Sequence, residues 1–382
     1  MELKKAGICT MNTGFNYGTC LQAYALKRIL YRLGYIPEVY RLSGSIIPDR
    51  DARREKIFIM RLRSFLHRKN IPAIVPTPGQ RSEVTLSLFH EFYVNTLRPE
   101  TVRWGELKRR AGLPWYKAFI CGSDQIWNAY ASYIDPLFYL RFAPREKRIA
   151  YAPSFGSGDI PSWNRGLMKQ WISGIPHLSV REESGQKLIR EMTGRDAEVL
   201  CDPVFLLTGE EWISSLSLTP HPGRYCLAYF LNDMSETARK RAEAFAARGY
   251  KIISLPYALE DPLLACEDAG PIEFLRLVLG AEEVLSDSYH ALLFSILFHT
   301  PVTVYRKPGA SNQDQPMRLL HILKKYGLEE CLDRPAENSA SIDFEPTDRI
   351  VEAERTKALA YLKRSLEKAE ADSAFIRNSD TV

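Results

Sequence analysis

Short apolar segments that end in polar or glycine residues alternate with helical patterns along almost the whole chain. In the first half the strand-like segments are KKAGICTM, YIPEVYRL, KAFICGSD, RIAYAPSFG, HLSVRE and AEVLCDP. In the second half they are RYCLAYFL, YKIISLPY, EEVLSDS and PVTVYRK, with helical stretches near 235–248, 271–280, 289–298 and 315–326. Regular strand–helix alternation is typical of parallel sheets covered by helices. The sequence therefore predicts an α/β protein with two Rossmann-like domains that face a cleft.

The alternation is interrupted once, from Gly209 to Gly223, where two prolines surround a histidine. The 382 residues, 45% of them hydrophobic, are enough for two cores of ordinary size. We predict an N-terminal domain over 1–210 and a C-terminal domain over 223–345. A long charged helix, roughly 347–375, dominates the remaining segment, 346–382, which we expect to cross back to the first domain.

Composition narrows the class of protein. The net charge of +5 is too weak to indicate a nucleic-acid partner. Seven scattered cysteines, with no CxxC and no histidine at metal-ligand spacing, predict a reducing compartment and no metal site. The start, MELKKAGICTMN, lacks the apolar core of a signal peptide, and the longest apolar run, ALLFSILF, is far shorter than the roughly 20 residues that span a bilayer. We expect a cytoplasmic protein, soluble or peripheral to a membrane.

Several common chemistries lack their sequence patterns. The chain has no GxGxxG after a strand, no GxxxxGK[ST], no HExxH and no GxSxG. Its one DxD, at 49–51, lies in a basic segment, and two acids so spaced often occur by chance. These absences remove the best support for nicotinamide, flavin or nucleoside triphosphate binding.

Two polar clusters follow strand-like segments of the first half. In NTGFNYGTCLQ, residues 12–22, glycines allow close backbone approach and the amino end of a helix points at a ligand; alternatively, Asn16 and Thr19 only cap that helix. In CGSDQIWN, residues 121–128, hydrogen-bonding side chains surround Trp127, a combination suited to gripping a sugar. Asp124 is equally explained as a helix cap.

Two further clusters carry charge. SVREES places Arg181 at a strand end, where a guanidinium can bind a carboxylate or phosphate through two parallel bonds; an ion pair with Glu182 or Glu183 is the structural alternative. A basic group, Arg306, Lys307 and Arg318, follows the helical stretch at 289–298.

The segment LSDSYHALLFSILF places a titratable imidazole, His290, at the carboxyl end of a strand. In an open parallel sheet, ligands bind outside these strand ends, where the amino end of the next helix favours an anion. The alternative is a histidine that packs the start of a buried helix.

Together these clusters resemble the polysaccharide pyruvyl transferase family. The resemblance rests on NYGTCLQAYAL, ICGSDQIWN, YAPSFG, SVREESG, DPVFLL and SDSYHALLFSILF, which occur in family order from about residue 5 to residue 330. Arg318 matches an arginine that introduces a similar helix in family members. The resemblance implies a glycosyltransferase-B-like fold and an enzyme that transfers the pyruvyl carbons of phosphoenolpyruvate to a sugar of a cell-surface polysaccharide or its lipid-linked precursor. The product is a cyclic pyruvate ketal, and no metal or redox cofactor is required.

The resemblance also implies roles for residues of this chain. His290, Asp287 and Arg181 are the expected catalytic residues, with His290 as the acid or base. The expected substrate-binding residues are Asn16, Tyr17, Gly18, Gln22, Ser123, Asp124, Gln125, Trp127, Asn128, Ser154, Ser288, Lys307 and Arg318.

The chain departs from the family pattern at two positions. Ser288 stands where some members have arginine, and Ala291 where others have glycine. Two other functions stay open: a glycosyltransferase that uses a nucleotide-activated sugar on a similar fold, and a catalytically idle saccharide-binding protein.

The basic segment 50–69 adds an expected partner. Apolar residues, among them Ile57, Met60 and Phe65, lie between arginines and lysines, as in a helix that lies on an anionic membrane surface. The alternative is a basic helix packed on its own domain.

Overall fold

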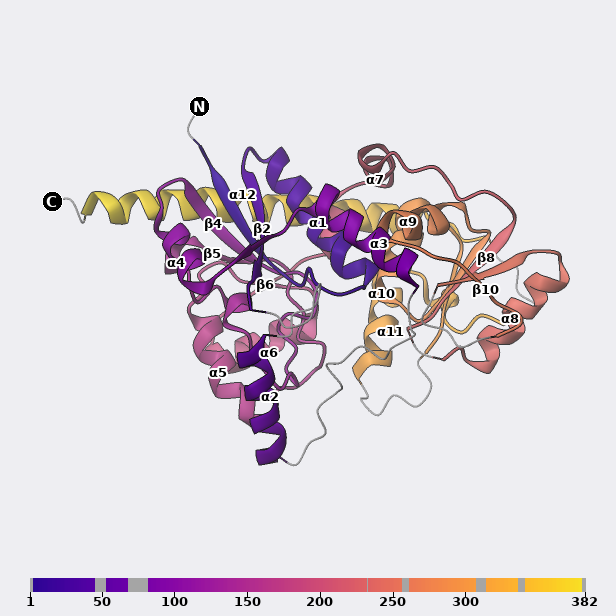
Figure 1. Ribbon diagram of the computed structural model, residues 1–382, viewed down its shortest axis with the longest axis horizontal. Coiled ribbons are helices and arrows are strands. Elements are labelled where there is room, and N and C mark those ends of the chain that lie inside the picture. Colours follow the sequence, from indigo (N-terminus) through magenta and orange to yellow (C-terminus); the bar gives the residue numbers. More distant parts are fainter. Residues whose placement is uncertain are drawn as a thin grey trace. The chain divides into compact units, whose positions relative to one another are not determined.

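The computed structural model describes residues 3–44, 53–67, 82–231, 233–255, 261–306, 314–335 and 341–379 (Figure 1). The chain divides into two compact units. Unit 1 comprises Met1–Pro76, Tyr93–Leu206 and Arg355–Val382. Unit 2 comprises Thr77–Phe92 and Leu207–Glu354.

Unit 1 is built on a five-stranded sheet in the order β3-β2-β1-β4-β5, and every neighbouring pair is parallel. Its strands are β1 (Lys5–Cys9), β2 (Ile36–Leu42), β3 (Glu100–Val102), β4 (Tyr116–Cys121) and β5 (Arg148–Ala150). A separate two-stranded parallel sheet pairs β6 (Ser179–Val180) with β7 (Glu198–Val199). The central strands β1 and β4 are buried on both faces apart from the partly buried Lys5, as is typical of parallel strands between helices.

Helices connect these strands. They are α1 (Tyr17–Arg32), α2 (Arg54–His67), α4 (Trp104–Gly112), α5 (Ser162–Ser173) and α6 (Glu183–Thr193), with the π-helical turn η1 (Phe92–Leu97) and the short η2 (Pro136–Tyr139), η3 (Arg145–Lys147) and η4 (Pro203–Leu206). The helical spacing of Leu21, Ala25, Ile29 and Leu33 predicts a helix here. In α1 the first three side chains are fully buried, whereas Leu33, the C-cap, is half-buried. The helix ends at Arg32, just before Gly34, whose positive φ suits a helix terminus.

Unit 2 repeats the architecture with a parallel sheet in the order β10-β9-β8-β11-β12. Its strands are β8 (Tyr225–Tyr229), β9 (Lys251–Ser254), β10 (Ala265–Cys266), β11 (Glu283–Ser286) and β12 (Val302–Val304). Its helices are α3 (Glu83–Glu91), α7 (Gly209–Leu216), α8 (Glu236–Ala247), α9 (Pro271–Gly280), α10 (Tyr289–Phe298), α11 (Asp314–Tyr326) and the short η5 (Glu329–Cys331). The prediction of two Rossmann-like α/β domains is confirmed; the cleft that they were expected to face stays a prediction.

The long helix α12 (Glu345–Ser379) serves both units and is drawn in yellow in Figure 1. Its first turns belong to unit 2, where Thr347 Oγ1 donates to the carbonyl oxygen of Tyr326 at 2.9 Å. From Arg355 on it belongs to unit 1, where Tyr361 Oη donates to the carbonyl oxygen of Ala150, in β5, at 2.9 Å. None of the described helices combines the length and the hydrophobicity that a membrane span requires.

One segment belongs to a different unit from the one predicted by the domain boundaries. Residues 82–92 were predicted to lie in the N-terminal domain, but the structure groups them with unit 2. The reason is contact with the β10–α9 connection: Thr85 Oγ1 donates to Asp268 Oδ1 at 2.9 Å, and Leu88 packs against Gly270. These partners lie more than 180 residues away along the chain, beyond the reach of any local pattern.

Candidate functional site

The strand order of unit 1 reverses direction between β1 and β4, the central pair of its sheet. In open α/β sheets the carboxyl ends of such a pair form the usual ligand site. The turn before α1 leaves β1 at this edge, and the CGSD turn leaves β4 beside it. The two polar clusters of the first half of the sequence therefore lie together at the switch point of unit 1.

Gln22 links the two turns through a buried hydrogen-bond network. Its Nε2 donates to Thr10 Oγ1 at 3.0 Å, and its Oε1 accepts from the backbone N–H of Ser123 at 3.1 Å. Thr19 Oγ1 adds a 2.7 Å bond to Asp124 Oδ2. Gln22 and Ser123 are fully buried, so they hold the two turns in register beneath the surface.

Backbone geometry fixes the second turn. Gly122 has φ of +114°, and a Cβ atom there would lie 2.0 Å from the carbonyl oxygen of Tyr151, so only glycine fits. Asp124 also has a positive φ, of 64°, and its carbonyl oxygen accepts from the backbone N–H of Ser154 at 2.9 Å. The hydroxyl of Ser154 in turn accepts from the N–H of Gly156 at 3.1 Å. Ser154 is fully buried and supports the turn from below.

At the start of α1, Asn16 caps the helix, which is the role that the sequence allowed as the alternative to ligand binding. Asn16 is the N-cap, and its Oδ1 accepts from the N–H of Thr19 at 3.1 Å. Tyr17 and Gly18, in the first turn, are buried, whereas Asn16 is half-buried. Asn16 is therefore the residue of NYG that reaches the surface of unit 1.

Trp127 does not have the predicted role of a sugar platform. Its side chain is fully buried, its ring stacks on Tyr139 at a centroid distance of 5.5 Å, and its Nε1 donates to the carbonyl oxygen of Phe138 at 3.0 Å. It packs the core under the turn, because an indole with a satisfied N–H is stable in an apolar interior. Gln125 and Asn128, on either side of it, are half-buried and closer to solvent.

Arg181 lies at the carboxyl end of β6, where it is buried and forms ion pairs. Its Nη1 is 2.9 Å from Asp202 Oδ2, and its Nε donates to Glu182 Oε1 at 3.0 Å. Glu182 is one of the two ion-pair partners, Glu182 or Glu183, that the sequence offered as the structural alternative, whereas Asp202 was not predicted. The signal was present in DPVFLL, where Asp202 also accepts from the N–H of Val204 at 3.1 Å and starts η4.

The sheet of unit 2 has its own switch point, between β8 and β11. Ser286 ends β11, and Asp287, Ser288 and His290 follow it at this edge. Asp287 Oδ1 accepts from the N–H of Leu231, after β8, at 2.7 Å, and Ser286 Oγ accepts from the N–H of Ser288 at 3.0 Å. Ser288 is the N-cap of α10. Asp287 thus fixes the loop that presents the start of α10.

His290 lies in the first turn of α10 with 9% of its surface exposed. Its ring meets that of Tyr289 edge to face, with a centroid distance of 5.1 Å. The aligned peptide dipoles of α10 make its amino end electropositive. An imidazole and a helix amino end at the switch point of a parallel sheet can together bind an anion and move a proton.

The basic group beyond α10 is only partly described. Arg306 is ion-paired with Asp333, with Nε and Oδ2 2.5 Å apart. Lys307 lies outside the described residues, and so does the side chain of Arg318, although its backbone belongs to α11. Among the described residues, no group of three or more His, Cys, Asp or Glu side chains is placed to hold a metal ion.

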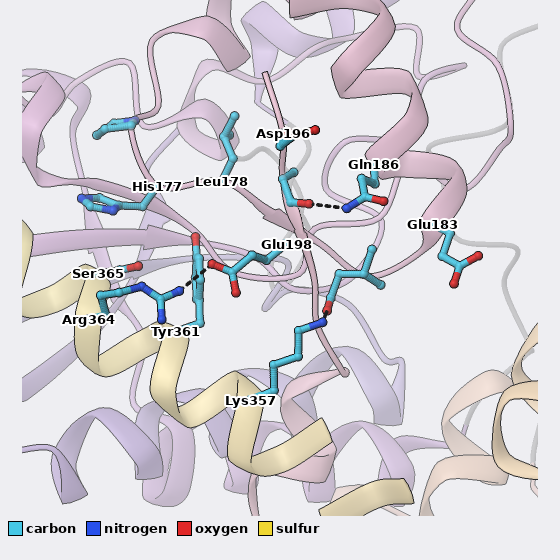
Figure 2. A pocket seen from close by; sticks show the side chains of 13 residues that line it. His177, Leu178, Glu183, Gln186, Asp196, Glu198, Lys357, Tyr361, Arg364 and Ser365 are labelled. Carbon is cyan, nitrogen blue, oxygen red and sulfur yellow. Dashed lines mark hydrogen bonds and ion pairs between the residues drawn. The ribbon is translucent and has the colours of Figure 1, made fainter. Parts of the chain in front are cut away.

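A pocket of about 730 Å³ lies in unit 1 beside the sheet of β6 and β7 (Figure 2). Figure 2 shows Lys357, Tyr361 and Arg364 reaching it from α12. Arg364 pairs with Glu198 at 2.5 Å, and Lys357 donates to the carbonyl oxygen of Val199 at 2.8 Å. The pocket contains none of the residues predicted to bind substrate or to act in catalysis.

His177, in the wall of this pocket, gives a pH-dependent contribution to stability. Burial lowers the pKa of His177 below its ordinary 6.5. The positive charges of Arg195 and Arg364 lower it further, while the negative charge of Asp372 opposes the shift. The unfolded chain therefore takes up this proton at higher pH than the folded protein does. As pH falls from about 7 to about 5, we expect His177 to reduce the free energy of unfolding.

The test is urea unfolding of the wild type and His177→Gln across this pH range. As the pH is lowered, the free energy of unfolding should decrease more for the wild type than for the variant. Two curves that stay parallel would show that His177 does not titrate differently in the folded protein.

Comparisons with known proteins agree with the sequence motifs. A family model described as polysaccharide pyruvyl transferase matches residues 16–306. No curated protein matches the chain. Similar solved structures include UDP-GlcNAc 2-epimerase from Neisseria meningitidis bound to UDP-GlcNAc, with 12% identity and a TM-score of 0.41 over 97% of this chain and 94% of that chain.

Two other similar structures are apo UGT2 from Phytolacca americana and E. coli heptosyltransferase WaaC with ADP. The first has 10% identity and a TM-score of 0.43 over 96% of this chain and 95% of that chain. The second has 12% identity and a TM-score of 0.38 over 92% of this chain and all of that chain, 100%.

Proposed function

The chain belongs to the polysaccharide pyruvyl transferase family, and we propose that it transfers the pyruvyl group of phosphoenolpyruvate to a sugar of a cell-surface polysaccharide or of its lipid-linked precursor. The product is a cyclic pyruvate ketal. Phosphoenolpyruvate is an intracellular metabolite, so we place the reaction in the cytoplasm.

The observation that carries this proposal is the position of His290. It lies at the switch point of the unit 2 sheet, in the electropositive first turn of α10, on a loop that Asp287 and Ser286 hold in place. Ketal formation needs a proton at the methylene carbon of the donor, and an imidazole exchanges protons near neutral pH.

In the proposed reaction His290 delivers a proton to the methylene carbon, which becomes a methyl group. The carbon that carries the phosphate gains positive charge, and one sugar hydroxyl attacks it and loses its proton. The C–O bond to phosphate then breaks, and a second hydroxyl closes the ketal with loss of a second proton. One phosphoenolpyruvate and one sugar diol thus give one ketal and one inorganic phosphate.

The donor carries about three negative charges, so fixed cations are needed. Arg181 already contacts two carboxylates, Glu182 and Asp202, which offset its charge. We therefore assign the larger share of donor binding to the start of α10, Lys307 and Arg318, and keep Arg181 as a contributor. For the acceptor we propose Asn16, Gln125 and Asn128, the half-buried residues of the unit 1 clusters.

The proposal is tested by incubating the purified protein with phosphoenolpyruvate and a panel of synthetic and lipid-linked glycosides. We expect inorganic phosphate release that depends on the acceptor, and an acceptor mass increased by that of pyruvic acid less one water. Uridine and guanosine diphosphate sugars serve as the comparison donors. Turnover of a nucleotide sugar without phosphoenolpyruvate, or no phosphate release from folded protein with any acceptor, would count against this function.

A further inference from the structure

The helix α2 of unit 1 exposes an apolar surface. Phe58, Leu62, Phe65 and Leu66 are exposed by 67%, 46%, 82% and 64%. Their spacing of four, three and one residues puts them on one side of a helix. Scattered exposed apolar residues are ordinary, but four large ones on adjoining turns form a patch of the kind that marks an interaction surface.

Two arginines fix which side of α2 faces outward. Arg63 Nη1 donates to Asn164 Oδ1 at 2.9 Å and to the carbonyl oxygen of Ser132 at 3.3 Å. Arg53, one residue before the helix, is ion-paired with the buried Asp135. Both tie the opposite side of α2 to the body of unit 1, so the apolar side is turned to solvent.

The exposed residues of α2 differ in part from those that the sequence predicted to face a membrane. Ile57 and Met60, expected on that surface, are half-buried and lie toward the body of unit 1, whereas Phe65 is exposed as expected. Phe58, Leu62 and Leu66 complete the exposed side.

The charges around the patch identify its partner. α2 carries four Lys and Arg residues against a single acid, Glu55. Arg54 and Arg61 are exposed. Since each residue turns the helix by about 100°, both side chains project along one edge of the apolar patch. A protein core would leave these guanidinium groups buried without compensation, whereas a lipid headgroup layer offers phosphates beside acyl chains.

We propose that α2 docks unit 1 on a membrane surface rich in anionic phospholipid. Phe58, Leu62, Phe65 and Leu66 enter the headgroup–acyl boundary, and Arg54 and Arg61 bind lipid phosphates at its edge. The helix lies in the plane of the surface and does not cross the bilayer. This docking is independent of the donor and of the reaction.

The test is co-sedimentation of the full chain with vesicles of phosphatidylcholine alone or mixed about equally with phosphatidylglycerol. We expect binding to the mixed vesicles and little to the neutral ones. Phe58→Ser with Phe65→Ser should weaken binding about tenfold or more, because two aromatic rings leave the interface. Arg54→Gln and Arg61→Gln should each weaken it about fivefold, and the remaining binding should depend less on salt.

The matched control is Phe375→Ser, a ring 76% exposed on α12 outside the patch. It should bind vesicles as the wild type does, and all variants should keep the wild-type melting temperature because the changed side chains are exposed. Equal sedimentation with neutral and anionic vesicles, or none with either, overturns the proposal. So does a chain that stays off vesicles but self-associates through Phe58 and Phe65 in analytical ultracentrifugation.

Discussion

Replacing His290 with glutamine should lower acceptor-dependent phosphate release from phosphoenolpyruvate by about 10²–10⁴-fold. Glutamine keeps most of the volume and one hydrogen-bonding end, but it cannot exchange a proton near neutral pH. The loss should appear mainly in kcat, since the proton is needed in the transition state more than in substrate binding. The measurement is initial phosphate release at saturating donor and acceptor, with donor binding followed by thermal shift.

The matched control is His321→Gln, the same change at an exposed position of α11. It should keep wild-type turnover. If His290→Gln also turned over at the wild-type rate, His290 would only pack the start of α10, which is the structural alternative that its sequence already allowed. A fall in turnover matched by a large fall in melting temperature would support the same conclusion.

The fold was accessible from the sequence because its signals are local. Each of the ten strand-like segments contains a strand of the structure, and β1, β4, β8 and β11 each end near polar or glycine residues. The sequence could not reveal the order of the strands. That order puts the two most polar turns of unit 1 at one switch point and His290 at the switch point of unit 2.

Side-chain direction was the main limit at the candidate site. Trp127 lies in an irregular turn, where neither the helix nor the strand period predicts which way a side chain points, and it enters the core. Gln22 lies on α1, where the helical pattern predicts burial only for apolar neighbours. It is buried because Ser123 and Thr10, from other elements, satisfy its amide. Such polar partners follow from tertiary structure alone.

Short elements held by distant partners were also missed. β3 and β10, of three and two residues, lie outside the ten strand-like segments. Asp202, 21 residues after Arg181, becomes its partner only when the segment after β7 returns beside β6. The sequence named Arg181 as an anion-binding residue, and the structure adds that its guanidinium is already held.

Replacing Asp202 with asparagine should lower the free energy of unfolding by about 3 kcal/mol. The side chains of Arg181 and Asp202 are only 3% and 0% exposed, so the change leaves a buried guanidinium with less compensating charge. Asparagine keeps the shape and an oxygen that can accept the N–H of Val204, so the loss reports the charge rather than the turn. Urea unfolding measures it.

The control is Asp196→Asn in the ion pair between Asp196 and Arg190, whose side chains are 73% and 65% exposed. Water screens that pair, so the same substitution should cost less than about 1 kcal/mol. Arg181→Met combined with Asp202→Leu should recover part of the loss, because no unpaired charge then stays buried. Equal costs for Asp202→Asn and Asp196→Asn would mean that water reaches Arg181, and a solvated Arg181 would again be a strong candidate for donor binding.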